Sequence, residues 1–259
     1  GVVVAHPVLL MTALYPVQLW RGSLQSKRYV DAFGEKLMSS LSERMDEKIS
    51  KRLASPDVQA SINDAVMCSA RKTSSANLDV LTSLVAEKVG VEEESDADLV
   101  LTESIKVMEK LSLNYIRFVS FIYFVRNVRV SGEGDLGKEN ITLFNNFLPV
   151  AFPVDELRKV RDSYLTYAGL FMSGRLYNES FCEIVAAKFG FSIQGDVCGK
   201  SLKKDSSIFE DCSYLTDIIL AFGYEAPADL DVAPINDVAD FIAISYLNSK
   251  GLSLKYPGQ

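Results

Sequence analysis

The chain has 259 residues, of which 48% are hydrophobic and 24% are charged, and its formal net charge is −7. This composition is typical of a folded protein and excludes wholesale disorder, collagen-like repeats and low-complexity architectures. The negative charge argues against a protein that coats nucleic acid over its whole surface. His6 is the single histidine, so a site built on several imidazoles is excluded, and a histidine-dependent catalytic triad would need this one residue.

The chain begins with an apolar segment, because residues 2–20 contain no charged side chain. This length is close to that of a membrane-spanning helix. However, Pro7 and Pro16 would interrupt a helix, and no basic segment precedes it as in a signal peptide. We expect a buried or interface segment, and we expect a membrane contact, if the protein makes one, only here.

Helical periodicity dominates the first half from about Ser23 onward. Apolar residues at every third or fourth position predict one long amphipathic helix whose stripe consists of Val30, Phe33, Leu37, Leu41, Met45, Ile49 and Leu53. Pro56 ends this helix and starts another, since proline suits a first helical turn. Further helices are predicted up to Gly90, after a capping pair formed by Ser95 and Asp98, and over the apolar residues 113–130.

Residues 131–140 contain three glycines and mixed charges, which predicts a linker. It would separate a helical domain (residues 1–130) from an acidic helical domain (residues 141–259). In the second domain, apolar patterns predict helices over residues 155–172, 178–189, 213–222 and 236–247. The predicted fold class is all-α, a multi-helix bundle with a second, smaller helical lobe.

The charge is unevenly distributed. Residues 1–130 carry 16 basic and 16 acidic side chains, whereas residues 131–259 carry 11 and 18. Residues 205–249 contain nine acids and no lysine or arginine. This stretch predicts a solvated acidic face, with a docking surface for a basic partner as the alternative.

Four cysteines occur, and no two of them form a Cys-x-x-Cys pair. A structural zinc site is therefore not expected. We expect reduced thiols and a cytoplasmic location, with Cys182 acting as a small buried side chain. The four positions are Cys68, Cys182, Cys198 and Cys212.

Two segments imitate phosphate-binding motifs. Residues 132–137 (GEGDLG) match the dinucleotide fingerprint, but Glu133 and Asp135 would repel a pyrophosphate. Residues 195–201 (GDVCGKS) have three residues between their glycines, where a P-loop needs four. Neither segment is predicted to bind a nucleotide, and no cofactor or metal site is expected.

A helix ending at Gly190 and a turn precede three lysines, which loosely resembles a helix-turn-helix. Lys200, Lys203 and Lys204 are the candidate nucleic-acid contacts of this alternative. The acidic stretch that follows disfavours nucleic acid as a partner. The other interpretation of the same sequence pattern is a set of small helices that pack on a common core.

Two segments, INDAVMCSARKTSSANLDVLTSLVAEKV and ESIKVMEKLSLNYIRFVSFIYFV, resemble the central part of a family of uncharacterised bacterial proteins. An Ala- and Ser-containing helix, a leucine-rich helix and an apolar helix pair carry the resemblance, which covers residues 62–125. DELRKVRDSYLTYAGLF, at residues 155–171, fits the same family. The resemblance implies a bacterial cytoplasmic protein and transfers no catalytic or binding residues.

The sequence therefore favours a protein that acts by protein–protein interaction or self-association, without intrinsic catalysis. The long charged helix and the apolar first segment motivate this interpretation. One alternative is a metal-dependent nuclease or hydrolase effector that relies on carboxylates. The other is the helix-turn-helix regulator.

Overall fold

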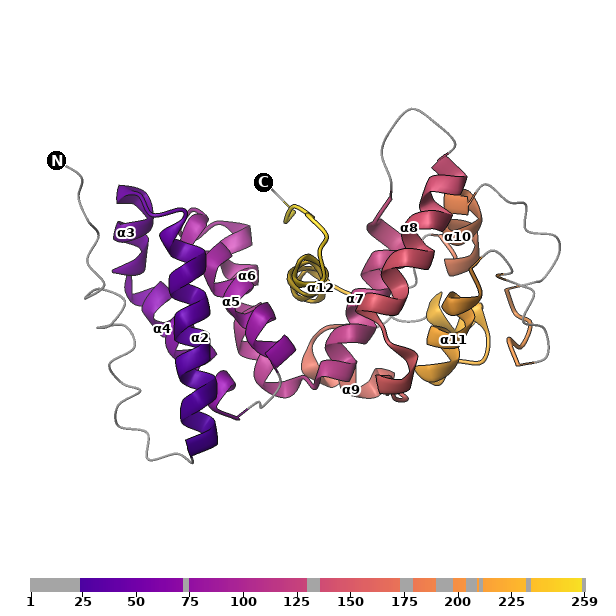
Figure 1. Cartoon of the computed structure of the whole chain (residues 1–259), viewed down its shortest axis with the longest axis horizontal. Coiled ribbons are helices and arrows are strands. Elements are labelled where there is room, and N and C mark those ends of the chain that lie inside the picture. The colour runs from indigo at the N-terminus through magenta and orange to yellow at the C-terminus, as the bar shows by residue number, and fades with distance from the viewer. Residues whose placement is uncertain are drawn as a thin grey trace. The chain divides into compact units, whose positions relative to one another are not determined.

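The computed structural model describes residues 24–71, 75–129, 136–172, 179–189, 198–203, 209, 212–231 and 234–257. Within these regions the regular structure is helical, apart from one isolated antiparallel bridge between Phe171 and Ile235 (Figure 1). The predicted all-α class is confirmed. No helix in the described regions is long and apolar enough to cross a membrane. The apolar residues 2–20, with His6, lie outside them.

The chain forms two compact units, and they do not follow the predicted boundary. Unit 1 comprises the chain up to Leu113 and again from Ile244, and unit 2 is Asn114–Ala243. Helices on both sides of the predicted linker lie in unit 2, where the Phe124 and Phe144 rings are 4.7 Å apart. Residues 136–140 of that linker are helical, and residues 131–135 lie outside the described regions. Aromatic packing across the glycine-rich segment explains the difference.

Unit 1 is a bundle of consecutive helices. Helix α2 packs against both α4 and α5, and α5 packs against α6, so that four helices enclose one core (Figure 1). Phe33, Leu37 and Leu84 are almost fully buried there. The helices are α2 (Leu24–Ser42), α3 (Glu47–Leu53), α4 (Pro56–Arg71), α5 (Ser75–Gly90) and α6 (Asp96–Val107), followed by the 3-10 turn η2 (Met108–Lys110).

The single long helix predicted through Leu53 is wrong, because α2 and α3 are separate. The Asp46 carboxylate accepts a hydrogen bond from the Ile49 amide at 2.7 Å and caps α3. A side chain that satisfies a helix's first amides stabilises a new start there. The stripe is nevertheless buried at most positions on both sides of the break. On the exposed side of α3, Glu47 and Lys51 form an ion pair at 2.9 Å.

Unit 2 is built around the apolar helix α7 (Leu113–Asn127), which was predicted. Its Phe118, Phe121 and Phe124 side chains are at most 1% exposed. Aromatic side chains bury a large area each, so this one helix supplies much of the core. The other helices are α8 (Leu136–Ala151), η3 (Val154–Glu156), α9 (Asp162–Ala168), α10 (Phe181–Phe189), α11 (Ser213–Ala221), η5 (Pro227–Asp231) and the first part of α12 (Asp237–Ser249).

The helix predicted over residues 155–172 is mostly absent, and only α9 remains of it. The Val160 amide donates to the Phe222 carbonyl at 3.0 Å, and the Arg158 amide donates to Asn114 Oδ1 at 2.9 Å. These long-range bonds take amides that a helix would have used. Gly169, with φ of 84°, then ends α9 in the left-handed conformation that glycine favours.

Of two helix starts predicted in the second half of the chain, one is shifted and the other is confirmed. Helix α10 begins at Phe181 rather than near residue 178. Helix α12 begins as predicted, since Asn236 Oδ1 accepts the Ala239 amide at 3.1 Å. The boundary between the two units falls inside α12, after Ala243.

Candidate functional site

The structure describes two of the three predicted nucleic-acid lysines, Lys200 and Lys203. Lys203 pairs with Glu225 at 2.7 Å, and both side chains are exposed. The hydrogen bond from Lys203 lowers the pKa of Glu225 below its ordinary range. Lys200 is exposed, and Lys204 lies outside the described residues. A nucleic-acid role for the three lysines remains a prediction.

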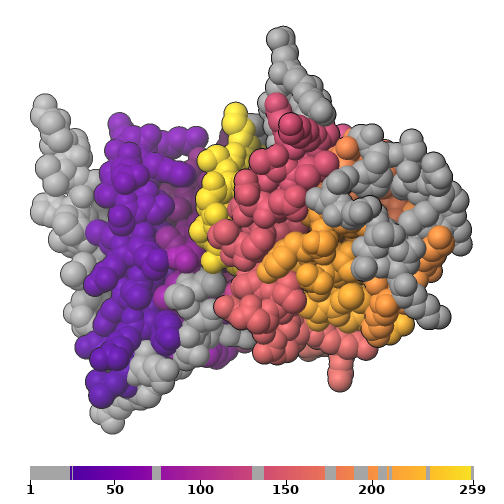
Figure 2. Space-filling model, turned by 45° about the vertical axis from the view of Figure 1, so that its right-hand side comes forward, coloured from indigo at the N-terminus to yellow at the C-terminus, as the bar shows by residue number. Residues whose placement is uncertain are grey.

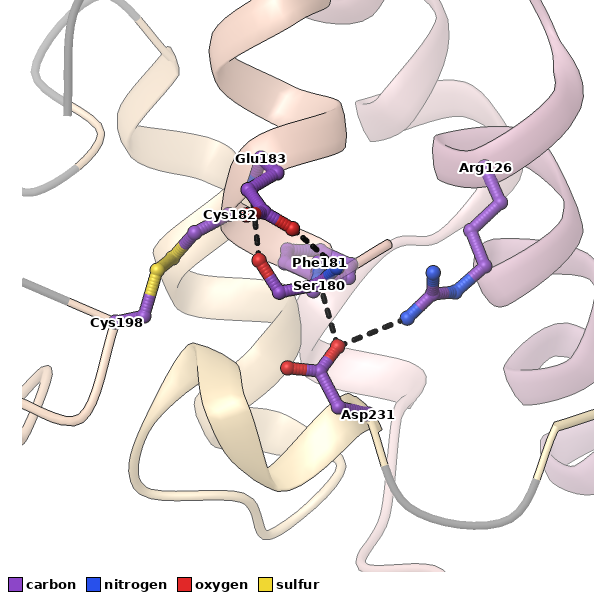
Figure 3. Close-up of a disulfide and its surroundings, with 7 residues drawn as sticks. All are labelled: Arg126, Ser180, Phe181, Cys182, Glu183, Cys198 and Asp231. Atoms are coloured by element: carbon purple, nitrogen blue, oxygen red, sulfur yellow. Dashed lines mark hydrogen bonds and ion pairs between the residues drawn. A yellow bond between two sulfur atoms is a disulfide. The ribbon is translucent and has the colours of Figure 1, made fainter. Parts of the chain in front are cut away.

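Two of the four cysteines form a disulfide, which contradicts the expectation of reduced thiols. Cys182 in the first turn of α10 is bonded to Cys198 (Figure 3). Cys68 and Cys212 are buried. Cys198 belongs to the P-loop imitation, whose residues 195–197 lie outside the described regions. The Cys198 carbonyl accepts a hydrogen bond from the Ala228 amide at 3.1 Å, so this part of the motif is bonded within the protein.

The start of α10 is held by a dense set of polar contacts beside the disulfide. Ser180 Oγ accepts the Glu183 amide at 3.2 Å, while Glu183 accepts the Ser180 amide at 2.8 Å, which is a capping box (Figure 3). Asp231 accepts from the Phe181 amide at 2.6 Å and pairs with Arg126 at 3.0 Å. These contacts explain why α10 starts at Phe181.

Several acids of the base-free stretch 205–249 have structural roles. Besides Asp231, the Asp229 carboxylate accepts the amides of Glu225 and Ala226 at 3.0 and 2.9 Å. Asp240 is mostly buried, and burial raises its pKa to about 7. The predicted solvated acidic face is therefore only a part of what these residues do.

A surface that sequence reasoning missed lies where α9 meets the start of α7. Tyr164 stacks on Tyr115 with ring centroids 4.9 Å apart, and Tyr167 lies 6.0 Å from Tyr164. Tyr167 is 74% exposed. We call Tyr115, Tyr164 and Tyr167 the tyrosine stack. Tyr164 is only half-buried, although the apolar pattern of residues 155–172 predicts one long helix there.

The neighbouring backbone and side chains fix the tyrosine stack in place. Asn114 donates to the Arg158 carbonyl at 2.7 Å and accepts the Arg158 amide, which joins the segment before α9 to α7. The Tyr224 hydroxyl donates to the Asp162 carboxylate. The Tyr224 ring stacks on Phe118 with centroids 5.5 Å apart. The rings therefore stand on ordered backbone, anchored to the core of unit 2.

Basic residues precede the tyrosine stack in the same segment. Arg158, Lys159 and Arg161 are exposed, and none of them forms an ion pair with another residue in the described part of the chain. The Arg158 guanidinium donates to the carbonyls of Asp155 and Leu157. The tyrosine stack and these three residues are called the α9 surface below. It offers aromatic rings and positive charge in an otherwise acidic half of the chain.

For the hydrolase alternative, the described regions contain no group of three or more histidine, cysteine, aspartate or glutamate side chains placed to hold a metal ion. The alternative thus gains no candidate residues from these regions.

Comparison with family models gives one match, which covers residues 25–213. This range includes residues 62–125, on which the resemblance rests, and also α7, α9 and the disulfide. Comparison with curated proteins and with solved structures gives no match. The match spans well over half of the chain, and the protein therefore belongs to a family of uncharacterised function.

Proposed function

We propose that the protein acts by binding a protein partner through the α9 surface, and that it has no catalytic activity of its own. The single observation that carries the proposal is the tyrosine stack, in which Tyr167 is 74% exposed while its neighbours are anchored. Tyrosine and arginine are enriched at protein interfaces and among the residues that dominate binding energy.

Anchoring matters because association has an entropic cost. Side chains that must be ordered on binding lose about 0.5–1.5 kcal/mol each. In the α9 surface, Tyr164 is already held between two rings, and α9 is tied to the core through Asp162 and Tyr224. A partner would therefore meet rings that are largely ordered in advance.

The charge of the α9 surface selects the chemistry of the partner. Arg158, Lys159 and Arg161 favour a segment that carries acidic and apolar side chains. A second copy of the chain could offer its acids at residues 205–249. Most of the acids that the structure describes in this stretch are paired or buried, namely Glu225, Asp229, Asp231 and Asp240, whereas Asp217 and Asp237 are exposed. A separate acidic partner is therefore favoured over self-association.

The location of the protein bears on where such a partner would be met. The cytoplasmic location, like the bacterial origin, remains a prediction. The pair Cys182–Cys198 argues against the cytoplasmic location, since disulfides persist in oxidising compartments and are rare in a reducing cytoplasm. Counting the free thiols of protein extracted under acid trapping would decide between a reducing cytoplasm and an oxidising compartment. We expect two of the four cysteines to be unreactive because they form the disulfide.

The binding proposal is tested by fluorescence anisotropy with a labelled peptide of alternating glutamate and leucine residues. We expect the full chain to bind this peptide and not a peptide in which lysine replaces every glutamate. Tyr167→Ala should weaken binding about tenfold, which corresponds to about 1.4 kcal/mol. Arg161→Glu should weaken it and reduce its salt dependence.

Val150→Ala is the matched control, because Val150 is also an exposed apolar side chain of unit 2, at 63%. It should leave the affinity unchanged. Equal binding of both peptides, or equal losses for Tyr167→Ala and Val150→Ala, would contradict the proposal. A dimer that dissociates on Tyr167→Ala, measured by light scattering, would replace the acidic partner with a second copy. Tighter binding of a single-stranded oligonucleotide than of the acidic peptide would also count against it.

A further inference from the structure

Unit 1 contains a pocket of about 670 Å³ that is independent of the α9 surface. One wall is a single face of α5, where residues 79, 82, 83, 86 and 87 recur at helical spacing. A second part of the lining comes from α2 and the turn after it, and C-terminal residues between 245 and 256 complete it. Both α2 (indigo) and the C-terminal segment (yellow) reach the molecular surface in Figure 2. The volume is in the range of small-molecule sites.

The C-terminal segment is fixed against this pocket by its own hydrogen bonds. Asn248 donates to the Leu254 carbonyl at 3.0 Å and accepts the Leu254 amide at 2.7 Å. The Tyr256 hydroxyl lies 2.9 Å from Ser83 Oγ and 2.8 Å from Ser245 Oγ. Tyr256 and Ser245 are buried. The lining therefore includes a preformed group of three hydroxyls from three parts of unit 1.

One polar group in the lining has no partner. Thr82 is 7% exposed, and its Oγ1 forms no hydrogen bond. A buried hydroxyl without a partner costs about 1–3 kcal/mol. This hydroxyl has almost no accessible surface as it stands, and a χ1 rotation of Thr82 would be needed to bring it into the pocket, where a ligand can supply the missing hydrogen bond.

The charged groups around the pocket are mainly basic. Lys36 pairs with Asp79 at 2.5 Å, and Arg44 makes a longer contact of 3.8 Å with Glu87. Lys255 also lines the pocket and forms no ion pair with another described residue. Three cations against two carboxylates leave a positive excess in a protein whose net charge is −7.

The end of the pocket near Tyr256 is suited to binding an anion. Glu87 and, more weakly, Arg44 act electrostatically on Tyr256, and Lys255 precedes Tyr256 in the chain. Arginine binds phosphate oxygens through paired N–H groups, and lysine binds them as a point charge. Burial raises the pKa of Tyr256 above its ordinary value of 10.0, so its hydroxyl remains neutral beside a bound anion.

We propose that this pocket binds a small organic phosphate that also carries hydroxyl groups. Its phosphate lies against Arg44 and Lys255, and one of its hydroxyl groups pairs with Thr82. The serine and tyrosine hydroxyls of the lining form hydrogen bonds with the remaining hydroxyl groups of the ligand. This function is separate from the proposed partner binding in unit 2.

The proposal is tested with the full chain by calorimetric titration of four probes: glucose 6-phosphate, glucose, inorganic phosphate and citrate. We expect glucose 6-phosphate to bind most tightly and glucose not at all. Lys255→Glu should weaken its binding at least about tenfold. Lys250→Glu is the control, since Lys250 lies nearby in sequence and outside the lining, and it should change nothing.

Thr82→Val separates ligand recognition from folding. Valine keeps the shape and removes an unpaired hydroxyl, so we expect an unchanged or raised melting temperature together with at least about threefold weaker binding. Thr216→Val is the matched control, because Thr216 Oγ1 is also buried and without a hydrogen bond, but in unit 2. It should leave binding unaffected.

The remaining outcomes overturn the proposal. Equal affinity for inorganic phosphate and glucose 6-phosphate would identify an adventitious ion only. Tighter binding of citrate would assign the pocket to carboxylates. Absence of heat with every probe up to about 10 mM would show that no ligand of this class binds. None of these results bears on the acidic peptide, so the two proposals fail separately.

Discussion

The ammonium group of Lys88 lies 2.8 Å from the carboxylate of Asp98, and the two side chains are 0% and 4% exposed. Asp98 also accepts from Arg52 at 2.7 Å, and Lys88 donates to Thr102 and pairs with Asp57, at 2.7 and 2.6 Å. These residues come from α3, α4, α5 and α6. One buried carboxylate and its partners thus link four helices of unit 1. The apolar pattern of the sequence alone does not specify which of these helices pack together.

Removing that carboxylate should be strongly destabilising. Asp98→Ala leaves Lys88 and Arg52 without their shared acceptor, and breaking a buried pair in this way costs about 3–5 kcal/mol. Glu47→Ala breaks the exposed pair with Lys51 and should cost no more than about 0.5 kcal/mol. Urea unfolding followed by circular dichroism measures both. A loss below 1 kcal/mol for Asp98→Ala would show that the network is unimportant for stability.

Asp240 should make the protein less stable as the pH rises from about 4 to about 7. Burial and the nearby Asp237 raise its pKa from 3.8 to about 7, so the unfolded chain releases this proton first. The free energy of unfolding should therefore fall across this window, by roughly 2–4 kcal/mol from this group. Tyr123 is the other titratable group close to it, and it remains neutral there. Asp240→Asn should flatten the profile, whereas Asp217→Asn, at an exposed position, should leave it unchanged.

Lys188 should act with the opposite sign at higher pH. Burial, Arg129 and Arg126 lower its pKa from 10.5 to about 7, although its ammonium group donates to the Val125 and Val128 carbonyls at the end of α7. Between pH 7 and about 10 the unfolded chain holds this proton and the folded chain does not, so stability should rise with pH. The difference between the wild type and Lys188→Met, measured from pH 6 to 10, should show the rise. A constant difference would contradict it.

Loss of the disulfide should destabilise the protein without changing its fold class. Cys182 and Cys198 are 16 residues apart, and closing a loop of this size is worth about 3 kcal/mol. Cys182→Ser and reduction of the wild type should therefore lower the free energy of unfolding by similar amounts. Cys212→Ser leaves the disulfide intact and is the control for loss of a buried sulfur. Four reactive thiols in denatured, unreduced protein would refute the pairing.

Sequence periodicity predicted the helices that depend on burying an apolar face. Helix α7 and the start of α12 follow from local patterns, since Phe121 and its neighbours need a core and Asn236 supplies a cap. The break between α2 and α3 depends on one hydrogen bond that the Ile49 amide donates to Asp46, although the apolar stripe continues on both sides of the break. A periodic pattern reports which residues are buried, but it does not report where a side chain competes for an amide.

The other missed features depend on residues far apart in the sequence. The segment before α9 is extended because Val160 bonds to Phe222, and the tyrosine stack joins Tyr115 to Tyr164. Cysteine spacing alone does not reveal which pairs meet in space. The pocket needs α2, α5 and the C-terminal segment together, and no local motif marks it.

The path of α12 has a consequence for synthesis on the ribosome. Domains generally fold as units while the chain emerges, and the residues of unit 2 are contiguous, so this unit can fold as soon as Ala243 is free. Unit 1 begins to emerge first, yet its pocket is complete only once Ser245 and Tyr256 have been added, more than 130 residues after Leu113. The unit that is translated first is thus the one that matures last.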